Sequence, residues 1–515
     1  MTDLLPLLSS DGMRAVDAAT MGDWGIPGRV LMETAGRAAA DAISARYPVA
    51  GSHVMVLAGT GNNGGDALVV ARVLWSRGAT VQVVALPTDA TEGDRAANVA
   101  LLTRLAASSD RLAFTERLVE VDLVIDGLLG IGATGDLREP VQSLCAWANR
   151  QPAPVVSLDI PSGLDATTGA APDDAIRADL TVTMGALKTG LVLRDGPEHA
   201  GELVTVEMGF PPSEVREHAS AWRATSAWVG RHLPRRAHDA HKYSAGRAAC
   251  VVGSRRYTGA AVLSTRAAYR AGAGAVVACT PRSVRAVLDA QNLEVMVRAY
   301  AETERGTLAL ESRDRIAKHL RDADAALIGC GLDSADPTRA LVRDLVRHAP
   351  CPVVLDADGL GAFAGHADTL RERTHPVLLT PHLGEYRRLI GDDDFTPVDR
   401  IETVREAAAR WNANVLLKGM PSVLGTPGGR VFVGPPGRPA LATAGTGDVL
   451  AGTLVGLAAQ GVSLEDAAVC GMHLGAAAVD VWAADHGLAP ELATGLMASD
   501  VVEALPRAAA TFASS

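Results

Sequence analysis

The chain has 515 residues, of which 48% are hydrophobic and 4% aromatic, and its formal net charge at pH 7 is −11. This length exceeds what one hydrophobic core supports, so we expect at least two domains. The scarcity of aromatic residues favours tightly packed α/β layers over an aromatic-rich β-sandwich. The negative charge argues against nucleic-acid and anionic-membrane surfaces, so we expect neither kind of partner.

The cysteines and the N-terminal segment indicate a cytoplasmic protein. The cysteines lie at positions 145, 250, 279, 330, 351 and 470. None is in a CxxC spacing, and we expect buried, reduced thiols rather than zinc ligands or disulfides. The segment from Met1 to Pro6 has no basic residue, so we expect no signal peptide. We also expect no apolar run of membrane-spanning length.

In the first half of the chain, apolar runs alternate with helical patterns. The predicted elements are helices over 13–47 and 67–77 and strands over 54–58, 81–86, 121–126 and 155–160. Buried strands that alternate with helices form a parallel sheet covered on both faces. Ligands bind such sheets at the carboxyl ends of the strands. We therefore expect a site directly after Ala58, Ile125 and Leu158.

A glycine-rich loop follows the first of these strands. Residues 59–64 match the dinucleotide fingerprint GxGxxG, so an NAD-dependent dehydrogenase is one interpretation. That interpretation needs an acidic residue at the end of the second strand, where it would bind the ribose hydroxyls. The second strand instead ends Val84-Ala85-Leu86-Pro87. An ordinary dehydrogenase is therefore disfavoured.

Oxygen-bearing side chains follow three of the predicted strands. Asn63, Asp126 and Ser162 could converge on a cation, because hard oxygen ligands suit such an ion. A second glycine-rich loop over 130–136 and the carboxylate of Asp159 belong to the same strand ends. Each aspartate alone is more often a cap or turn residue. Their grouping at glycine-rich strand ends favours a binding site.

A stretch rich in proline and charge follows, and we place the domain boundary near 215–225. A second α/β series then begins. Its predicted strands cover 249–253, 275–278, 325–329, 353–356, 377–380 and 414–418.

Residues 442–452 form a glycine-rich turn that leads into a helix. Backbone N–H groups of such a turn and the helix N-terminus suit a phosphate. Asp448 would then act as a general base or metal partner, although it could also be only a capping residue. His382 ends another strand, where a lone histidine is more often structural, and the segment 418–422 could hold an adenosine phosphate. Together these segments predict a nucleotide-phosphate site.

Lysine is rare in this arginine-rich chain. It occurs only at positions 188, 242, 318 and 418. Lys188, Lys242 and Lys418 lie beside glycine-rich or histidine motifs, whereas Lys318 lies in a plain amphipathic segment. The first three are therefore candidates for a functional role.

In their order along the chain, these motifs resemble the bacterial bifunctional NAD(P)H-hydrate repair enzymes, over nearly the whole chain. In that family an epimerase domain is fused to an ADP/ATP-dependent dehydratase domain. The matching segments in the first half are 31–36, 61–66, Asp126 and 159–163. Those in the second half are 241–242, 257–261, 356–358, 380–385, 417–419 and 445–448.

The resemblance implies the fold and the binding residues. It implies a Rossmann-like three-layer α/β epimerase domain over 1–218 and a ribokinase-like three-layer α/β dehydratase domain over 219–515. The hydrated nucleotide would contact the first half at Asn62, Asn63, Gly64, Gly65, Asp66, Gly130, Ile131, Gly132, Ala133, Thr134, Gly135, Asp136 and Asp159. Potassium would bind at Asn63, Asp126 and Ser162. In the second half the hydrate would contact Ala261, Gly331, His382 and Asp448. The adenine nucleotide would contact Lys418, Gly419, Met420, Pro421, Ser422, Gly445, Thr446 and Gly447.

The chain departs from the family pattern at two turns. Cys330 and Asp333 replace the proline and the final glycine of a Gly-Pro-Gly-Leu-Gly turn, and Leu383 replaces the second proline of TPHPGE. These changes alter loop stiffness and leave the implied contact residues in place.

The implied activity is repair of hydrated NADH and NADPH. The first half would epimerise the R and S hydrates, with Asp159 as the acid–base group. The second half would dehydrate the S form with ADP or ATP, releasing AMP or ADP and phosphate. Asp448 would remove the hydroxyl proton, and Mg²⁺ would serve as a cofactor beside K⁺. We expect a cytoplasmic homo-oligomer.

Two alternatives stay open. The first is a ribokinase-like small-molecule kinase fused to a nucleotide-binding module. The second is a first half that only senses nucleotides or acts as a scaffold. The sequence does not decide between ADP and ATP, or between the hydrates of NADH and NADPH. It also leaves open the oligomeric state, any communication between the two sites and the carboxylates that hold Mg²⁺.

Overall fold

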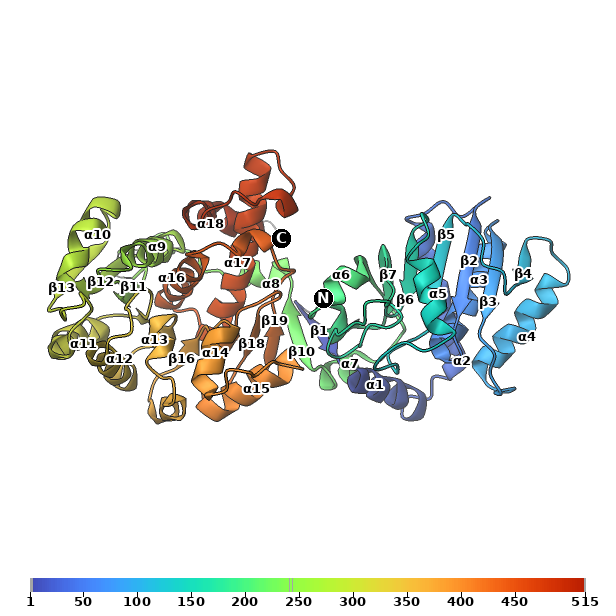
Figure 1. Ribbon diagram of the computed structural model, residues 1–515, viewed down its shortest axis with the longest axis horizontal. Coiled ribbons are helices and arrows are strands. Elements are labelled where there is room, and N and C mark those ends of the chain that lie inside the picture. Colours follow the sequence, from blue (N-terminus) through green and yellow to red (C-terminus); the bar gives the residue numbers. More distant parts are fainter. Residues whose placement is uncertain (1–2, 240, 243, 514–515) are drawn as a thin grey trace. The chain divides into compact units, whose positions relative to one another are not determined.

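The computed structural model describes residues 3–239, 241–242 and 244–513 (Figure 1). The chain divides into two compact units. The N-terminal unit is Pro6–Ala221, and the C-terminal unit is Trp222–Ser515 together with Met1–Leu5. The assignment of separate functions to residues 1–218 and 219–515 stays a prediction.

The N-terminal unit contains a parallel sheet. Its strand order is β4-β3-β2-β5-β6-β7-β9. The bounds are β4 (Leu112–Phe114), β3 (Thr80–Ala85), β2 (His53–Ala58), β5 (Leu123–Gly127), β6 (Val155–Leu158), β7 (Leu180–Met184) and β9 (Glu202–Val206). Strand β2 lies between β3 and β5, and Val56 is in register with Val83 of β3 and Ile125 of β5. The predicted parallel sheet is confirmed.

Helices cover both faces of this sheet because its strands are apolar on both sides. Val56 of β2 belongs to the core shared with α2 (Gly28–Ser44) and α3 (Asn62–Ser76). The next residue, Leu57, belongs to the opposite core, with α5 (Val141–Ala148). Successive strand residues point to opposite faces, which gives the unit its three layers.

The remaining elements of this unit are shorter or peripheral. They are α1 (Ser10–Gly22), α4 (Asp94–Ala106), α6 (Gly196–Ala200), α7 (Pro212–Glu217), β8 (Leu187–Lys188) and the 3₁₀ helix Thr189–Leu191. The single helix predicted over 13–47 is wrong, because α1 ends at Gly22 and α2 begins at Gly28. Pro27 precedes α2 as its N-cap residue. Proline has no N–H to donate and is tolerated at the start of a helix but not in its interior.

The C-terminal unit contains a larger sheet. Its strand order is β13-β12-β11-β14-β15-β16-β17-β18-β19-β10. The bounds are β10 (Ala221–Ala224), β11 (Arg247–Val251), β12 (Ala275–Pro281), β13 (Met296–Tyr300), β14 (Ala325–Ile328), β15 (Val353–Leu355), β16 (Val377–Leu379), β17 (Asn414–Leu417), β18 (Val423–Gly425) and β19 (Val431–Val433). Pairing is parallel from β13 to β17 and antiparallel from β17 through β18 to β19.

Helices flank this second sheet. They are α8 (Ser226–His232), α9 (Thr258–Arg270), α10 (Arg285–Gln291), α11 (Arg313–Arg321), α12 (Asp336–His348), α13 (Asp358–Gly361), α14 (Leu383–Ile390), α15 (Arg400–Trp411), α16 (Thr446–Ala459), α17 (Leu464–Asp485) and α18 (Ala498–Phe512). Helices α9, α16, α17 and α18 share one apolar core. Helix α16 lies very close to α9, because a Cβ built on Gly452 would be 2.1 Å from the carbonyl oxygen of Ser264. The predicted α/β class is confirmed in both units.

Helix α17 is long and apolar enough to cross a membrane by length and composition. The expectation that no segment reaches this length is therefore wrong. However, 67% of the apolar window is buried inside the structure, as in the core helix of a folded unit. The cysteines are all free and buried, as predicted.

Candidate active sites

The N-terminal unit has a cavity of about 590 Å³ at the carboxyl ends of β2, β5 and β6. The predicted contact residues that line it are Asn62, Asn63, Asp66, Gly130, Ile131, Gly132, Ala133 and Asp159. The cavity lining does not include Thr134, Gly135 and Asp136, which are exposed farther along the second loop. The structure therefore brings three separate strand ends to one cavity, as the sheet topology predicts.

Two further predicted contact residues, Gly64 and Gly65, lie in tightly packed positions. A Cβ on Gly64 would lie 2.1 Å from the carbonyl oxygen of Gly59, and a Cβ on Gly65 would lie 2.4 Å from Cε of Met32. These glycines let α3 begin close to the preceding loop and pack closely against α2. They do not line the cavity.

Asn63 carries a buried oxygen without a hydrogen-bond partner. Its Nδ2 donates to the carbonyl oxygens of Leu129 and Leu158, at 2.7 and 3.0 Å. This fixes the side chain, and Oδ1 finds no hydrogen-bond donor among the described residues. An unpaired buried amide oxygen is costly, so this atom fits a cation ligand.

Asp126 and Ser162 lie beside each other in the same region. The Ser162 hydroxyl donates to Asp126 Oδ1 at 2.6 Å and accepts from the backbone N–H of Leu129 at 2.9 Å. The backbone N–H of Ser162 donates to Asp126 Oδ2 at 2.9 Å. Burial raises the pKa of Asp126, and the hydrogen bonds from Ser162 oppose that rise. The structure thus places both oxygen-bearing residues close to the loop that anchors Asn63.

Asp159 is paired with a buried lysine. Its Oδ1 accepts a hydrogen bond from the backbone N–H of Met184 at 3.0 Å and another from the Lys188 ammonium. The side chain of Lys188 is 1% exposed, and its ammonium also donates to Thr183 Oγ1 at 3.1 Å and to the Met184 carbonyl at 2.8 Å. The rarity of lysine in this chain makes Lys188 a candidate functional residue, but no sequence signal indicates that Asp159 is its partner.

Asp17 of α1 lines the same cavity, and the sequence analysis missed it. Burial raises its pKa to about 6, with Lys188 opposing the rise and Asp159 reinforcing it. Burial also raises the pKa of the neighbouring Asp66. Asp17 lies inside an amphipathic helical pattern without a motif, so the sequence offered no signal for it.

In the C-terminal unit a charged cluster lies at the ends of β15, β16 and β17. Lys418 Nζ is 2.9 Å from Asp356 Oδ1 and 3.7 Å from Glu385 Oε2. Thr380 Oγ1 donates to the same Asp356 oxygen at 2.7 Å. Burial favours the neutral amine of Lys418, but Asp356 and Glu385 outweigh it and raise the pKa of the ammonium. Lys418 was predicted to lie in a site, whereas Glu385 was not given a role.

Asp448 lies in the first turn of α16, behind Gly445, whose φ is +93°. Its carboxylate, the carboxylate of Asp356 and the thiol of Cys330 lie within 4.8 Å of one another. Burial and then the charge of Asp356 raise the pKa of Asp448 to about 6. Burial raises the pKa of the Cys330 thiol, so the sulfur keeps its proton. Two carboxylates fit a hard cation, and a protonated thiol does not.

The other predicted hydrate contacts have varied environments. His382 caps α14, and its Nδ1 accepts from the backbone N–H groups of Gly384 and Glu385 at 3.0 and 3.3 Å. Its side chain is 55% exposed. Ala261 is fully buried, so its methyl group is closed to ligands. Gly331 has a φ of +67°, and a Cβ there would lie 2.8 Å from the carbonyl oxygen of Tyr257.

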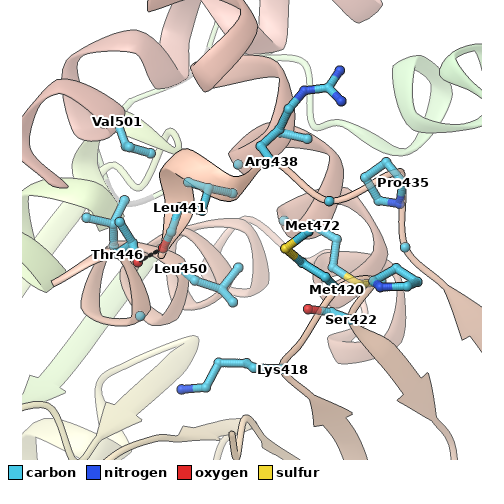
Figure 2. A pocket seen from close by; sticks show the side chains of 18 of the residues that line it. Lys418, Met420, Ser422, Pro435, Arg438, Leu441, Thr446, Leu450, Met472 and Val501 are labelled. Carbon is cyan, nitrogen blue, oxygen red and sulfur yellow. Dashed lines mark hydrogen bonds between the residues drawn. The ribbon is translucent and has the colours of Figure 1, made fainter. Parts of the chain in front are cut away.

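A cavity of about 290 Å³ opens beside this cluster (Figure 2). The predicted nucleotide contacts that line it are Lys418, Gly419, Met420, Pro421, Ser422, Thr446 and Gly447. Gly445 lies outside the lining. Its apolar walls include Leu441, Leu450, Met472 and Val501, which Figure 2 shows around the opening.

This cavity has an apolar part and a polar end. Thr446 Oγ1 donates to the Leu441 carbonyl at 2.7 Å, which holds the start of α16 against the wall (Figure 2). A Cβ on Gly447 would lie 3.6 Å from Lys418 Nζ, so the lysine and the helix start face each other closely. An apolar slot that ends at a helix N-terminus and a lysine suits a nucleotide base with its phosphates.

The chain matches two family models. One is described as NAD(P)H-hydrate dehydratase and matches residues 248–500, and the other is the YjeF-related protein N-terminus and matches residues 28–190. The bifunctional NAD(P)H-hydrate repair enzyme Nnr of Salinibacter ruber is 42% identical, over 98% of this chain and 96% of that protein. The enzyme of the same name from Moorella thermoacetica is 36% identical, over 97% of this chain and 96% of that protein. A crystal structure of ADP/ATP-dependent NAD(P)H-hydrate dehydratase from Bacillus subtilis, co-crystallised with ATP and Mg²⁺, is 30% identical. It covers 56% of this chain and 97% of its own, with a TM-score of 0.47.

Proposed function

The chain belongs to the family of bifunctional NAD(P)H-hydrate repair enzymes, and we propose which of its residues carry the two activities. The N-terminal unit epimerises the R and S hydrates of NADH and NADPH at the cavity that contains Asp159. The C-terminal unit dehydrates the S hydrate with ADP or ATP at the cluster of Lys418, Asp356 and Asp448. The observation that carries the second assignment is this charged cluster, which adjoins an apolar cavity of about 290 Å³ at the start of α16.

Dehydration needs a better leaving group than hydroxide. Asp448 accepts the proton of the hydrate hydroxyl, and the oxygen attacks the terminal phosphorus of the nucleotide. The bond from that phosphorus to the nucleotide oxygen breaks, which releases AMP from ADP or ADP from ATP. The lone pair of the ring nitrogen then expels phosphate, and loss of a proton from the adjacent carbon restores the reduced ring.

The residues around Asp448 hold the charges of this transfer. The N–H groups at the start of α16 and the ammonium of Lys418 bind the phosphate oxygens. The carboxylate of Asp356, which has an oxygen within 4.8 Å of the carboxylate of Asp448, would hold Mg²⁺. When bound, Mg²⁺ neutralises charge on the nucleotide phosphates. The thiol of Cys330 takes no part as a ligand because it is soft and protonated.

Epimerisation inverts the carbon that carries the hydroxyl. Asp159 exchanges a proton with that hydroxyl, and Lys188 holds the carboxylate in place through its buried ammonium. The unpaired Oδ1 of Asn63 would bind K⁺ with oxygens of Asp126 and Ser162. The ion would supply a fixed positive charge that holds the loops after β2, β5 and β6 together. The cytoplasmic location and the homo-oligomeric state stay predictions.

Absorbance at 340 nm tests this proposal. A mixture of both NADPH-hydrate epimers is incubated with the protein, Mg²⁺ and either ADP or ATP. Full recovery of reduced nucleotide establishes both activities, and the rates show which phosphate donor is preferred. Recovery of about half means that the N-terminal unit is silent. No recovery, together with a stable phosphorylated product from a small alcohol, would favour the kinase alternative.

Two matched variants assign the activities to the units. Asp448→Asn should abolish recovery from the S hydrate. Asp159→Ala should abolish only the recovery that depends on the R hydrate. If both variants recover both epimers at the wild-type rate, the assigned residues are wrong.

A further inference from the structure

The cavity of the N-terminal unit contains two carboxyl groups in different environments. Asp159 follows β6, and its carboxylate accepts hydrogen bonds from Lys188 and from the backbone N–H of Met184. Asp17 comes from α1, and among the described residues its carboxyl makes no hydrogen bond or ion pair. Lys188 attracts both groups, but its three ammonium hydrogens are engaged by Asp159, Thr183 and Met184.

The two groups differ in their hydrogen-bond partners. Two hydrogen-bond donors, one of them charged, hold the carboxyl group of Asp159. Asp17 has no such donor, and burial raises its pKa to about 6, against the attraction of Lys188 and with the repulsion of Asp159. A pair of acids whose environments differ in this way is suited to acid and base roles in one reaction. Asp17, whose pKa is raised to about 6, can therefore carry a proton beside the carboxyl group of Asp159 that Lys188 holds.

Epimerisation requires two proton transfers at different atoms. When the ring opens, the hydroxyl loses its proton and the carbon–nitrogen bond breaks, with the electron pair moving to nitrogen. The oxygen becomes an aldehyde carbonyl, and the nitrogen takes up a proton. Rotation followed by closure on the other face reverses both transfers, so no oxidant or other reactant is needed. Two carboxyl groups that reach one cavity from different elements can serve these two atoms separately, one as proton acceptor at oxygen and one as proton donor at nitrogen.

We propose that Asp17 is the second catalytic residue of the epimerase site and exchanges a proton with the ring nitrogen, while Asp159 exchanges one with the hydroxyl oxygen. This assignment rests on the proposed epimerase function. It gives α1 a catalytic role, since that helix supplies Asp17 to a cavity that is also lined by strand ends, the start of α3 and residues of α2.

The test compares Asp17→Asn with Asp23→Asn in the full-length chain. Asp23 is the exposed C-cap residue of α1 and does not line the cavity, so it controls for the same substitution on the same helix. Dehydration of the purified R hydrate with ADP and Mg²⁺ depends on epimerisation, because the C-terminal unit uses the S form. Dehydration of the purified S hydrate serves as the internal control for a folded, active chain.

Asp17→Asn should lower the R-dependent rate by at least about 100-fold, the usual scale for loss of a general acid. Its rate with the S hydrate should equal that of the wild type, and its Kd for the R hydrate should change by less than about threefold. Asp23→Asn should match the wild type in all three measurements. Asp17→Glu retains a carboxyl group and should keep part of the R-dependent rate, which guards against a folding defect in Asp17→Asn.

The proposal is overturned if Asp17→Asn epimerises within about threefold of the wild type. It is also overturned if Asp17→Glu loses as much as Asp17→Asn while circular dichroism shows both folded. A wild-type chain that dehydrates the S hydrate but does not accelerate conversion of the R hydrate contradicts the proposed epimerase function itself. The two failures are therefore distinguishable.

Discussion

Replacing Lys188 with methionine should strongly destabilise the N-terminal unit. The change keeps the apolar stem and removes an ammonium that is 1% exposed and donates to Asp159, Thr183 and Met184. The carboxylate of Asp159, which is 14% exposed, is left with one donor, the backbone N–H of Met184. Removing one partner of a buried ion pair costs about 3–5 kcal/mol, because the remaining charge is uncompensated.

Urea unfolding of the full-length chain measures this cost. With a slope of about 2 kcal/mol per molar urea, the midpoint of the N-terminal unit should fall by about 1.5–2.5 M. Lys318→Met is the matched control, because Lys318 is exposed on α11 of the C-terminal unit. It should leave the unfolding midpoints unchanged within about 0.3 M, since surface changes cost about 0.5 kcal/mol or less.

A double variant separates lost charge compensation from lost packing. Lys188→Met combined with Asp159→Asn has no uncompensated carboxylate, so it should recover at least about 1 kcal/mol relative to Lys188→Met alone. If Lys188→Met shifts the midpoint by less than about 0.5 M, the reasoning about the buried pair is wrong. A double variant that is less stable than the single variant would also refute it.

Three further predictions concern Asp448 and Asn63. Asp448→Asn should lower the rate of dehydration of the S hydrate about 10²–10⁴-fold, while its affinity for the adenine nucleotide stays within about threefold of the wild type. A near-normal turnover would show that Asp448 is not the base. The pKa of Asp448 is raised to about 6 from 3.8, so the stability it contributes is fully present below about pH 3.8 and lost as the pH rises through about 6. In denaturant titrations, the free energy of unfolding of Asp448→Asn should therefore exceed that of the wild type by about 1–3 kcal/mol at pH 8 and by almost nothing at pH 4. A difference of equal size at both pH values would contradict this pH dependence. Replacing K⁺ with Na⁺ should slow wild-type epimer exchange and leave Asn63→Ala unaffected, whereas equal sensitivity of both chains would exclude Asn63 from the cation site.

Much of the fold follows from local patterns in the sequence. The apolar run at 54–58 predicts a buried strand, and β2 covers His53–Ala58. The run at 353–356 likewise becomes β15, Val353–Leu355. Such runs are informative because a strand buried on both faces must be apolar at every position. The helix predicted over 13–47 failed because its periodicity continues across Pro27, where the chain breaks into two helices.

The antiparallel strands β18 and β19 were not predicted. Each has three residues, Val423–Gly425 and Val431–Val433, which is too short for a clear alternation pattern. Their pairing with β17 is set by packing in the sheet. Short strands of this kind depend on tertiary contacts more than on their own propensity.

By itself, the sequence determined which strand ends and glycine-rich loops are candidates for a site, because these are local features and parallel topology brings them to one edge of each sheet. Only the tertiary structure decided which groups act on one another. Lys188 bonds to Asp159 across 29 positions and Lys418 to Asp356 across 62, and Asp17 reaches the cavity from a helix without a motif. These pairings arise when separate elements pack, so burial and long-range contact, which no local pattern encodes, determine the partners of each charged group.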